Sequence, residues 1–350
     1  MRTAATSSRV GTRVRHLVPA RIRRAAVRFV SARRAAEVEH ELAALARDAR
    51  PIAVGPWLGE VGFELLYWVP FVRWFAERYH LDPTRVIAVT RGGAAAWYAP
   101  FAGHAVDALV FMTPDAFRTK NAQRNRQLGE QKQIAVTALD KEILEIVRRE
   151  RQHDVAVLHP SLMYWLFAPY WWGHQPMDWV RRRAEYRRLE PPRLDVALPS
   201  DYTAVKFYFN DAFPDTAENR AFVGRTVAAL QREGPVVSLS SGISVDDHLT
   251  CDVDASGAGS SDPAVMALRG TGDRVTPETN LLVQSAIVSR ARRFVGTYGG
   301  FAYLAPFYGV AAETYYSKPD GFSRRHLDLV GEVLGQIRGG ALSARPVADR

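Results

Sequence analysis

The segment that most constrains the fold is 278–310, which reads ETNLLVQSAIVSRARRFVGTYGGFAYLAPFYGV. Apolar residues recur at helical spacing over 281–288, after Pro277, a residue that favours a helix start. A short apolar strand at 293–296 follows, and a second helix is expected over 301–307. A helix, a strand, paired glycines and a helix in this order form half of a doubly wound unit.

Thr297, Tyr298, Gly299 and Gly300 join that strand to the second helix. Glycines permit backbone angles that other residues resist, and they leave the backbone amides uncovered. Uncovered amides at the start of a helix form an anion site suited to a diphosphate, so we expect these four residues to contact a nucleotide. A tight turn without a ligand is an equally open interpretation of a lone Gly-Gly pair.

The same segment resembles the donor-side motif of glycosyltransferases of the GT-B fold, in which a helix ending in "sRA" leads to "fVGt.GG...LAP..G". It is similar in the same way to heptosyltransferases and to some fucosyl- and xylosyltransferase-like families. The resemblance covers 278–310 well and the rest of the chain only by the order of its elements. It implies an α/β chain of two doubly wound, Rossmann-like domains facing a cleft, with the glycines at the diphosphate of a nucleotide sugar.

Composition narrows the class of protein. The chain has 350 residues, 47% of them hydrophobic, which is enough for two globular domains with substantial cores. Cys251 is the only cysteine, so no intrachain disulfide can form and a reducing, cytoplasmic compartment is favoured. No stretch of about 18 apolar residues is free of charge, so we expect no membrane span. The N-terminus lacks the apolar core of a secretory signal.

The positive charge is concentrated at the N-terminus. Residues 1–36 contain ten arginines and no acidic residue, so this leader has a charge of +10. Since the net charge of the chain is +9, residues 37–350 together have a charge of −1. We therefore expect no nucleic-acid binding by the folded part. Apolar residues recur at helical spacing among the arginines of 22–32, which permits a helix on an anionic membrane, at the inner face of the cell membrane. A poorly ordered basic leader is the competing interpretation.

Repeated strand, loop and helix patterns predict the domain organisation. We expect a basic leader and an amphipathic helix in 1–50, an α/β domain at 51–190, a second α/β domain at 191–338 and a disordered tail at 339–350. The resemblance implies that the first of these domains binds the acceptor and that the second binds the nucleotide sugar. The basic and Pro-rich segment 181–199 is the best linker in the chain.

Within these domains, VIAVT at 86–90 is the clearest strand, and 108–112 reads as the next one. The polar and basic run 118–133 is expected to be an exposed loop. Residues 202–209 read as a buried strand that carries one lysine.

The acceptor-side candidates lie in 55–79, a Gly/Pro loop that becomes a strongly apolar helix. This stretch resembles the heptosyltransferase start "GD.L..lPal", in which an acid precedes a proline by six residues. Glu64 has that spacing to Pro70, whereas Glu60 follows a glycine, Gly59. The resemblance implies that one of the two is the catalytic base, with Glu64 slightly preferred. Both could instead only stabilise the start of a helix through its dipole.

The donor-side candidates lie in the second domain. Lys206 and Asn210 come at the end of its first strand, where GT-B enzymes place a cation against the donor phosphate, and the resemblance implies that role here. A charge in such a strand must also reach a partner. Glu313, just past the Gly-rich helix, could bind a pair of ribose hydroxyls, and His248 could contact the donor ribose or phosphate.

A metal site is disfavoured. Asp252 and Asp254 spell DVD, the DxD pattern with which metal-dependent GT-A glycosyltransferases hold a divalent cation. The pattern is frequent by chance, and here it lies between two strands of a late domain. We predict no metal and no cofactor apart from the nucleoside-diphosphate sugar, which is a substrate.

The sequence therefore favours a glycosyltransferase that moves a sugar from a nucleoside-diphosphate sugar to a hydroxyl of a glycan or lipid-linked acceptor. The heptosyltransferase resemblance implies inversion without a metal. A non-catalytic nucleotide- or glycan-binding protein with the same fold is the competing hypothesis. A dinucleotide-dependent oxidoreductase is disfavoured because no GxGxxG follows a strand.

Overall fold

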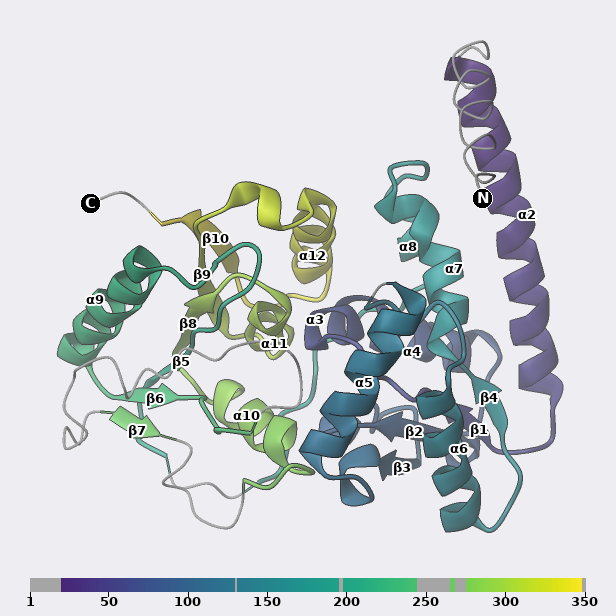
Figure 1. Ribbon diagram of the computed structural model, residues 1–350, viewed down its shortest axis with the longest axis horizontal. Coiled ribbons are helices and arrows are strands. Elements are labelled where there is room, and N and C mark those ends of the chain that lie inside the picture. Colours follow the sequence, from purple (N-terminus) through teal and green to yellow (C-terminus); the bar gives the residue numbers. More distant parts are fainter. Residues whose placement is uncertain (1–19, 130, 195–197, 244–264, 268–274, 348–350) are drawn as a thin grey trace, which may run out of the picture.

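Two parallel sheets form the framework of the molecule (Figure 1). The computed structural model describes residues 20–129, 131–194, 198–243, 265–267 and 275–347. The strands of the first sheet lie within 52–158 and those of the second within 203–346. This arrangement confirms the predicted fold class of two doubly wound α/β units, whereas the exact domain boundaries remain predictions.

The first sheet has the strand order β3-β2-β1-β4, and every pair is parallel. Ile52 of β1 lies opposite Val86 on one side and Ala156 on the other. The chain starts in β1, moves outward through β2 and β3, and returns to the far side of β1, so a switch point lies between β1 and β4.

The strands are β1 (Ile52–Val54), β2 (Val86–Thr90), β3 (His104–Asp107) and β4 (Ala156–Leu158). The helical segments of this half are α2 (Ala20–Arg47), α3 (Val61–Phe63), the π-helix η1 (Glu64–Trp68), α4 (Val69–Arg78), η2 (Pro83–Arg85), η3 (Ala94–Trp97), η4 (Ala108–Val110), α5 (Pro114–Leu128), α6 (Ala138–Arg151), α7 (Pro160–Trp171) and α8 (Asp178–Arg181).

The second sheet has the order β10-β9-β8-β5-β6-β7 and is also parallel throughout. Thr203 of β5 lies opposite Val236 and Arg293, so β5 is central and the switch point falls between β5 and β8. The strands are β5 (Thr203–Lys206), β6 (Val236–Ser238), β7 (Val265–Ala267), β8 (Arg293–Thr297), β9 (Ala311–Tyr316) and β10 (Leu342–Pro346). The helical segments are α9 (Ala217–Glu233), α10 (Asn280–Val288), η7 (Gly300–Tyr303), α11 (Leu304–Phe307), η8 (Pro319–Gly321) and α12 (Arg324–Gln336).

The expectation of an exposed loop at 118–133 is wrong, because most of this run belongs to the helix α5. Thr113 caps the helix by accepting a hydrogen bond from the Ala116 amide, and Pro114 occupies the first turn. Gly129 ends the helix in the left-handed conformation, with φ of 70°. These are ordinary start and stop signals, and the scarcity of apolar residues between them concealed the helix.

Three shorter expectations also need correction. The strand expected at 108–112 lies earlier, in β3, because the Asp107 carboxylate accepts a hydrogen bond from the Leu109 amide and starts a 3-10 turn. The tail from 339 is not disordered over β10, which pairs with β9 along its whole length. The helix expected over 301–307 is the 3-10 turn η7 followed by the four-residue α11.

Pro70 interrupts the helical stretch 61–78 without ending it. A proline lacks an amide hydrogen and its ring crowds the carbonyl four residues earlier. The π-helix η1 comes immediately before this turn, with the Val69 amide bonded to the Glu64 carbonyl. The Leu66 carbonyl accepts a hydrogen bond from the Tyr186 hydroxyl at 3.0 Å instead. The segment between the two halves is thereby attached to this helix.

The helix α2 packs on the first half through one stripe and then extends past it (Figure 1). Ser31, Ala35, Val38 and Leu42 are buried at helical spacing, and α2 lies against α7. Before that stripe begins, Phe29 and Val30 are 71% and 65% exposed. No helix in the described ranges has the length and apolar character needed to cross a bilayer.

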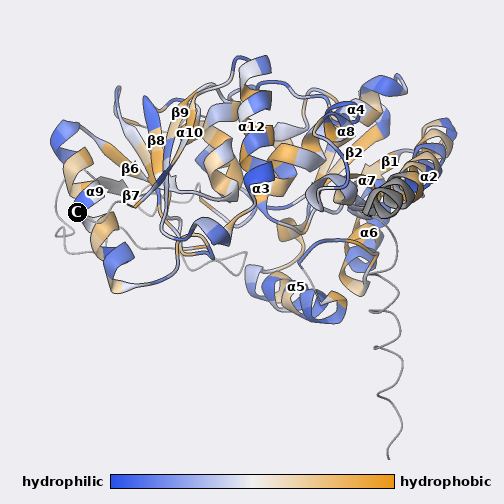
Figure 2. Ribbon diagram, turned by 90° about the horizontal axis from the view of Figure 1, so that it is seen from above, coloured by the Kyte–Doolittle hydropathy of each residue, from blue (hydrophilic) through white to orange (hydrophobic). Residues whose placement is uncertain are grey.

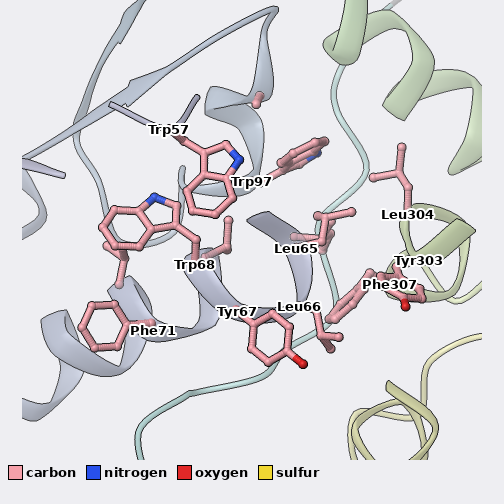
Figure 3. Close-up of a cluster of buried hydrophobic side chains, with 14 of the residues drawn as sticks. Trp57, Leu65, Leu66, Tyr67, Trp68, Phe71, Trp97, Tyr303, Leu304 and Phe307 are labelled. Carbon is pink, nitrogen blue, oxygen red and sulfur yellow. The ribbon is translucent and has the colours of Figure 1, made fainter. Parts of the chain in front are cut away.

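One hydrophobic cluster continues from the first half into the second. Figure 3 shows Trp57, Leu65 and Trp68, from the stretch after β1, in the same cluster as Leu304 and Phe307 of α11. All five side chains are at most 2% exposed. Colouring by hydropathy shows that outer helices such as α5 and α9 carry both polar and apolar residues (Figure 2). The two halves are therefore joined by an apolar interface.

Candidate functional site

A pocket of about 410 Å³ lies between the two halves, at the carboxyl ends of their central strands. The loops after β5 and β8 contribute residues 208–212 and 298–300 to its wall, and these two strands flank the switch point of the second sheet. The stretch after β1, which flanks the other switch point, contributes Glu60 and Gly62. Open α/β sheets bind ligands at such points, so the topology marks this pocket as the candidate site.

The structure brings together five of the residues predicted from the sequence. They are Glu60, Asn210, Tyr298, Gly299 and Gly300, all on the wall of the pocket. It places four others elsewhere, namely Glu64, Lys206, Thr297 and Glu313. His248 lies outside the described residues, as do Asp252 and Asp254.

The paired glycines serve a close contact between the halves. A side chain on Gly62 would collide with the Gly300 backbone, and a Cβ on Gly300 would stand 2.7 Å from the Gly62 nitrogen. A Cβ on Gly299 would stand 2.8 Å from Asn210 Nδ2. The segment after the glycines is a 3-10 turn and a four-residue helix, which is shorter than the helix predicted from the sequence. The glycines also leave room for the neighbouring backbone and for the pocket.

Lys206 and Thr297 have partners behind the pocket wall. The Lys206 ammonium donates a hydrogen bond to Gln284 Oε1 at 2.6 Å and lies 3.8 Å from the centre of the Phe301 ring. Thr297 is fully buried, and its hydroxyl lies between the amide and the carbonyl of Tyr208. Both residues therefore hold the loops that form the wall.

Glu313 faces a different part of the second sheet. It accepts hydrogen bonds from the Tyr315 hydroxyl at 2.7 Å and from Arg345 of β10 at 2.9 Å. This pairing fastens the edge strand and leaves the proposed ribose contact without structural support. Within the described part of the chain, no group of three or more His, Cys, Asp or Glu side chains is arranged to hold a metal ion.

Glu64 is enclosed in the first half. Its side chain is 0% exposed, and Oε1 accepts a hydrogen bond from the Tyr98 hydroxyl at 2.7 Å. Burial raises the pKa of the Glu64 carboxyl to about 7, although the Arg91 charge and the Tyr98 hydrogen bond oppose that rise. A group with no exposed surface does not reach a ligand in the pocket, so the preference for Glu64 as the base loses its basis.

Glu60 is the carboxylate that the stretch after β1 places at the pocket. Glu60 occupies the N-cap position of α3 without a side-chain capping bond, and its carbonyl accepts hydrogen bonds from the Glu64 amide at 3.1 Å and from Trp57 Nε1 at 3.3 Å. These contacts fix the backbone of Glu60, and the side chain is half-buried. Arg91, buried beneath the loop, donates to the Gly59 carbonyl and holds the same turn.

His326 and Tyr67 are pocket residues that the sequence did not reveal. The Tyr67 hydroxyl lies 2.6 Å from His326 Nδ1, which joins η1 of the first half to α12 of the second. Burial lowers the pKa of His326 to about 4, with the Lys132 charge acting in the same direction, so the imidazole is neutral near pH 7. No local signal identifies such a pair, because 259 residues separate its members in sequence.

Aromatic rings make up much of the remaining wall. A sugar presents C–H faces that stack on rings and hydroxyls that bond to polar tips. The wall offers both features, together with Gln131, Asp211 and Ser323. The aromatic members are Phe63, Tyr67, Tyr208, Phe209, Tyr298, Tyr303 and Phe322.

His159, at the end of β4, has a structural role in this fold. Its Nδ1 accepts a hydrogen bond from the Ser161 amide at 3.1 Å and so caps α7. Its Nε2 lies 3.2 Å from Asp140 Oδ1, and both side chains are buried. Neither residue lines the pocket.

Comparisons with known proteins give distant likenesses only. No family model and no curated protein matches the chain. Among solved structures, the chain is similar to a glycosyl transferase family 9 protein from Veillonella parvula, with 10% identity, a TM-score of 0.44 and 86% of each chain covered. The ADP-heptose LPS heptosyltransferase II of E. coli shares 11% identity over 83% of this chain and 99% of its own, with a TM-score of 0.41. The glycosyltransferase SnogD of Streptomyces nogalater shares 12% over 84% and 85%, with a TM-score of 0.34. At these values the similarities carry no argument about activity.

Proposed function

We propose that the protein is a glycosyltransferase that uses a nucleoside-diphosphate sugar and a glycan or lipid-linked acceptor. One observation carries the proposal: the switch points of two separate doubly wound sheets face the same pocket. Each switch point is a ligand-binding position in its own sheet, so a shared pocket suits a reaction between two substrates. The first half supplies the Glu60 carboxylate, and the second half supplies the backbone at Gly299 and Gly300 and the side chain of Asn210.

In this proposal Glu60 is the general base. It takes the proton from an acceptor hydroxyl as the hydroxyl oxygen forms a bond to the anomeric carbon. The bond from that carbon to the diphosphate breaks, and the nucleoside diphosphate leaves with the electron pair. Asn210 and the backbone at Gly299 and Gly300 would face the leaving group, and the rings would position the sugar. Inversion without a metal rests on the heptosyltransferase resemblance alone.

The setting of the reaction is also a proposal. The arginine-rich N-terminus would bring the enzyme to an anionic membrane surface, and a lipid-linked acceptor would be met there. A chain with a single cysteine cannot form an intrachain disulfide, which suits the reducing compartment at the inner face of the cell membrane. The likeness to fucosyl- and xylosyltransferase-like families remains a prediction.

The two glutamates supply a matched test. We expect Glu60→Gln to lower sugar transfer by roughly a hundredfold or more, the usual contribution of a general base. Glu64→Gln should retain transfer, because Glu64 does not reach the pocket. Release of nucleoside diphosphate from a panel of nucleotide sugars, with mixed glycan and polyprenyl-linked acceptors, measures both variants.

Two outcomes would count against the proposal. Equal transfer by Glu60→Gln and the wild type would remove Glu60 from the reaction. Nucleotide binding without any release of product by the wild type would favour the non-catalytic binding protein.

A further inference from the structure

A second hollow, of about 740 Å³, lies apart from the central pocket. It is formed by α8, the segment 182–188 that follows it, and the end of α12. It shares no lining residue with the central pocket. Four arginines line it, against two acidic residues, Asp178 and Glu185.

Two of those arginines are neutralised by carboxylates. Arg181 lies 3.2 Å from Asp178 and 3.6 Å from Glu332. Arg187 lies 2.9 Å from Glu77 and 3.3 Å from Glu185. The acidic residues of the wall are thus already paired.

The other two arginines, Arg182 and Arg188, have no carboxylate partner among the residues that the structure describes. Arg182 donates to the Asp178 carbonyl at 3.3 Å, and Arg188 donates to the Tyr308 carbonyl at 2.9 Å. A guanidinium has five N–H donors, so capping a carbonyl uses only a small part of each group. The carbonyl contacts fix the positions of the two side chains but do not neutralise their charges. The hollow therefore holds two positive charges without carboxylate partners among the described residues.

Arg188 is an exposed residue whose guanidinium lies beside Gly309. Its guanidinium lies so close to Gly309 that a side chain at 309 would collide with it. Gly309 has φ of 85°, a left-handed conformation that favours glycine. The hydrogen bond to the Tyr308 carbonyl already restrains this guanidinium, so part of the cost of ordering it is met before an anion binds. The guanidinium groups of Arg182 and Arg188 suit the oxygens of a phosphate, because each can donate a pair of parallel hydrogen bonds.

We propose that the hollow formed by α8, residues 182–188 and the end of α12 binds a phosphate-bearing anion through Arg182 and Arg188. The phosphate comes either from a soluble ligand or from a lipid headgroup. Both α8 and α12 lie on the side of the molecule towards which the N-terminal end of α2 extends (Figure 1). Trp172, just after α7, is 63% exposed, as an interfacial tryptophan would be.

The test compares two double variants of the full chain that remove the same charge. Arg182→Gln with Arg188→Gln alters the hollow. Arg118→Gln with Arg149→Gln alters a half-buried arginine on α5, paired with Asp115, and an exposed arginine on α6. One arm measures binding of inorganic pyrophosphate by calorimetry. The other measures binding to vesicles of equal parts phosphatidylcholine and phosphatidylglycerol, with pure phosphatidylcholine vesicles as the reference.

We expect the Arg182→Gln/Arg188→Gln variant to bind pyrophosphate or anionic vesicles roughly tenfold more weakly than the control variant does, since two charge-assisted contacts are lost. Loss confined to pyrophosphate identifies a soluble phosphate ligand, and loss of vesicle binding identifies a lipid headgroup. The proposal is overturned if the two double variants bind equally in both arms, or if the wild type binds neither probe. Should the double variant fail to fold, Arg182→Gln alone is informative, because its described bond stays within its own helical turn.

Discussion

Among single residues, Glu64 shows how burial alone changes the chemistry of a carboxyl group. Its folded-state pKa of about 7 lies above the ordinary value of 4.5. The folded state therefore binds more protons than the unfolded state between those two values. The stabilising contribution of the protonated group is fully present below the lower value and is lost as the pH rises through the higher one.

This gives a prediction for Glu64→Gln, which keeps an acceptor for Tyr98 but has no charge to bury. Above a pH of about 8 the variant should be more stable than the wild type by about 3 kcal/mol, and near a pH of about 4 the two should be alike. Urea denaturation across this range measures the difference. His326 shifts wild-type stability the other way over an overlapping range, because its pKa is lowered, so only the difference between the proteins is informative.

The control for this measurement is Glu142→Gln, at an exposed carboxylate paired with Lys120. Surface pairs of this kind contribute at most about 1 kcal/mol. If the wild type and Glu64→Gln keep a constant difference in stability at all pH values, then Glu64 does not titrate as described.

At the level of elements, the sequence was most informative where the local pattern was strong. The strand at 86–90 was predicted because every residue of VIAVT is apolar or β-branched, and all five are buried. The helix α5 was missed because only Phe117 and Arg124 are buried along it, so its caps were the remaining signal. β10 was missed because a short edge strand has little hydrophobic pattern of its own, and its pairing with β9 is a tertiary contact.

The residues of the candidate site likewise divide into those with a local sequence signal and those placed by tertiary contacts. Asn210, Tyr298 and the two glycines come soon after central strands, and ligands of open α/β sheets bind at such strand ends. These residues could therefore be predicted from the local sequence. The choice between Glu60 and Glu64 could not be made from the sequence, because burial of one carboxyl depends on Tyr98 and Arg91 from another loop. The pairing of Tyr67 with His326 depends on how the two halves pack.

The contact between α3 and η7 yields a prediction about two glycines. In Gly62→Ala the new methyl group would meet the Gly300 backbone, which cannot move unless the halves separate. Overpacking of this kind costs about 1–3 kcal/mol of unfolding free energy, or more. Gly224→Ala is the matched control, because a Cβ there has nothing within 4 Å and lies in the helix α9.

The control should gain up to about 1 kcal/mol, since alanine is the better helix former. Urea denaturation of both variants gives the two free energies. Equal stability of the two alanine variants would mean that the halves do not pack through these glycines.

At the scale of the whole molecule, the two halves act as one framework around the pocket. An apolar cluster passes from one to the other, and polar contacts add to it, including Trp97 Nε1 to Ser285 Oγ at 3.1 Å. Tyr170 of α7 also donates to the Arg325 carbonyl of α12 at 2.6 Å. A ligand in the pocket touches both halves, so its binding should stabilise the molecule as a whole.

The most direct measurement is therefore the unfolding free energy of the protein with UDP, GDP, ADP, CMP and TDP, each with and without magnesium or manganese. We predict that one nucleoside diphosphate raises it by about 2.7 kcal/mol at a hundred times its dissociation constant, without a metal. Gly299→Ala, which narrows the pocket beside Asn210, should reduce that gain, and Gly224→Ala should not. If no nucleotide stabilises the protein, the pocket is not a donor site and the proposed glycosyl transfer is contradicted.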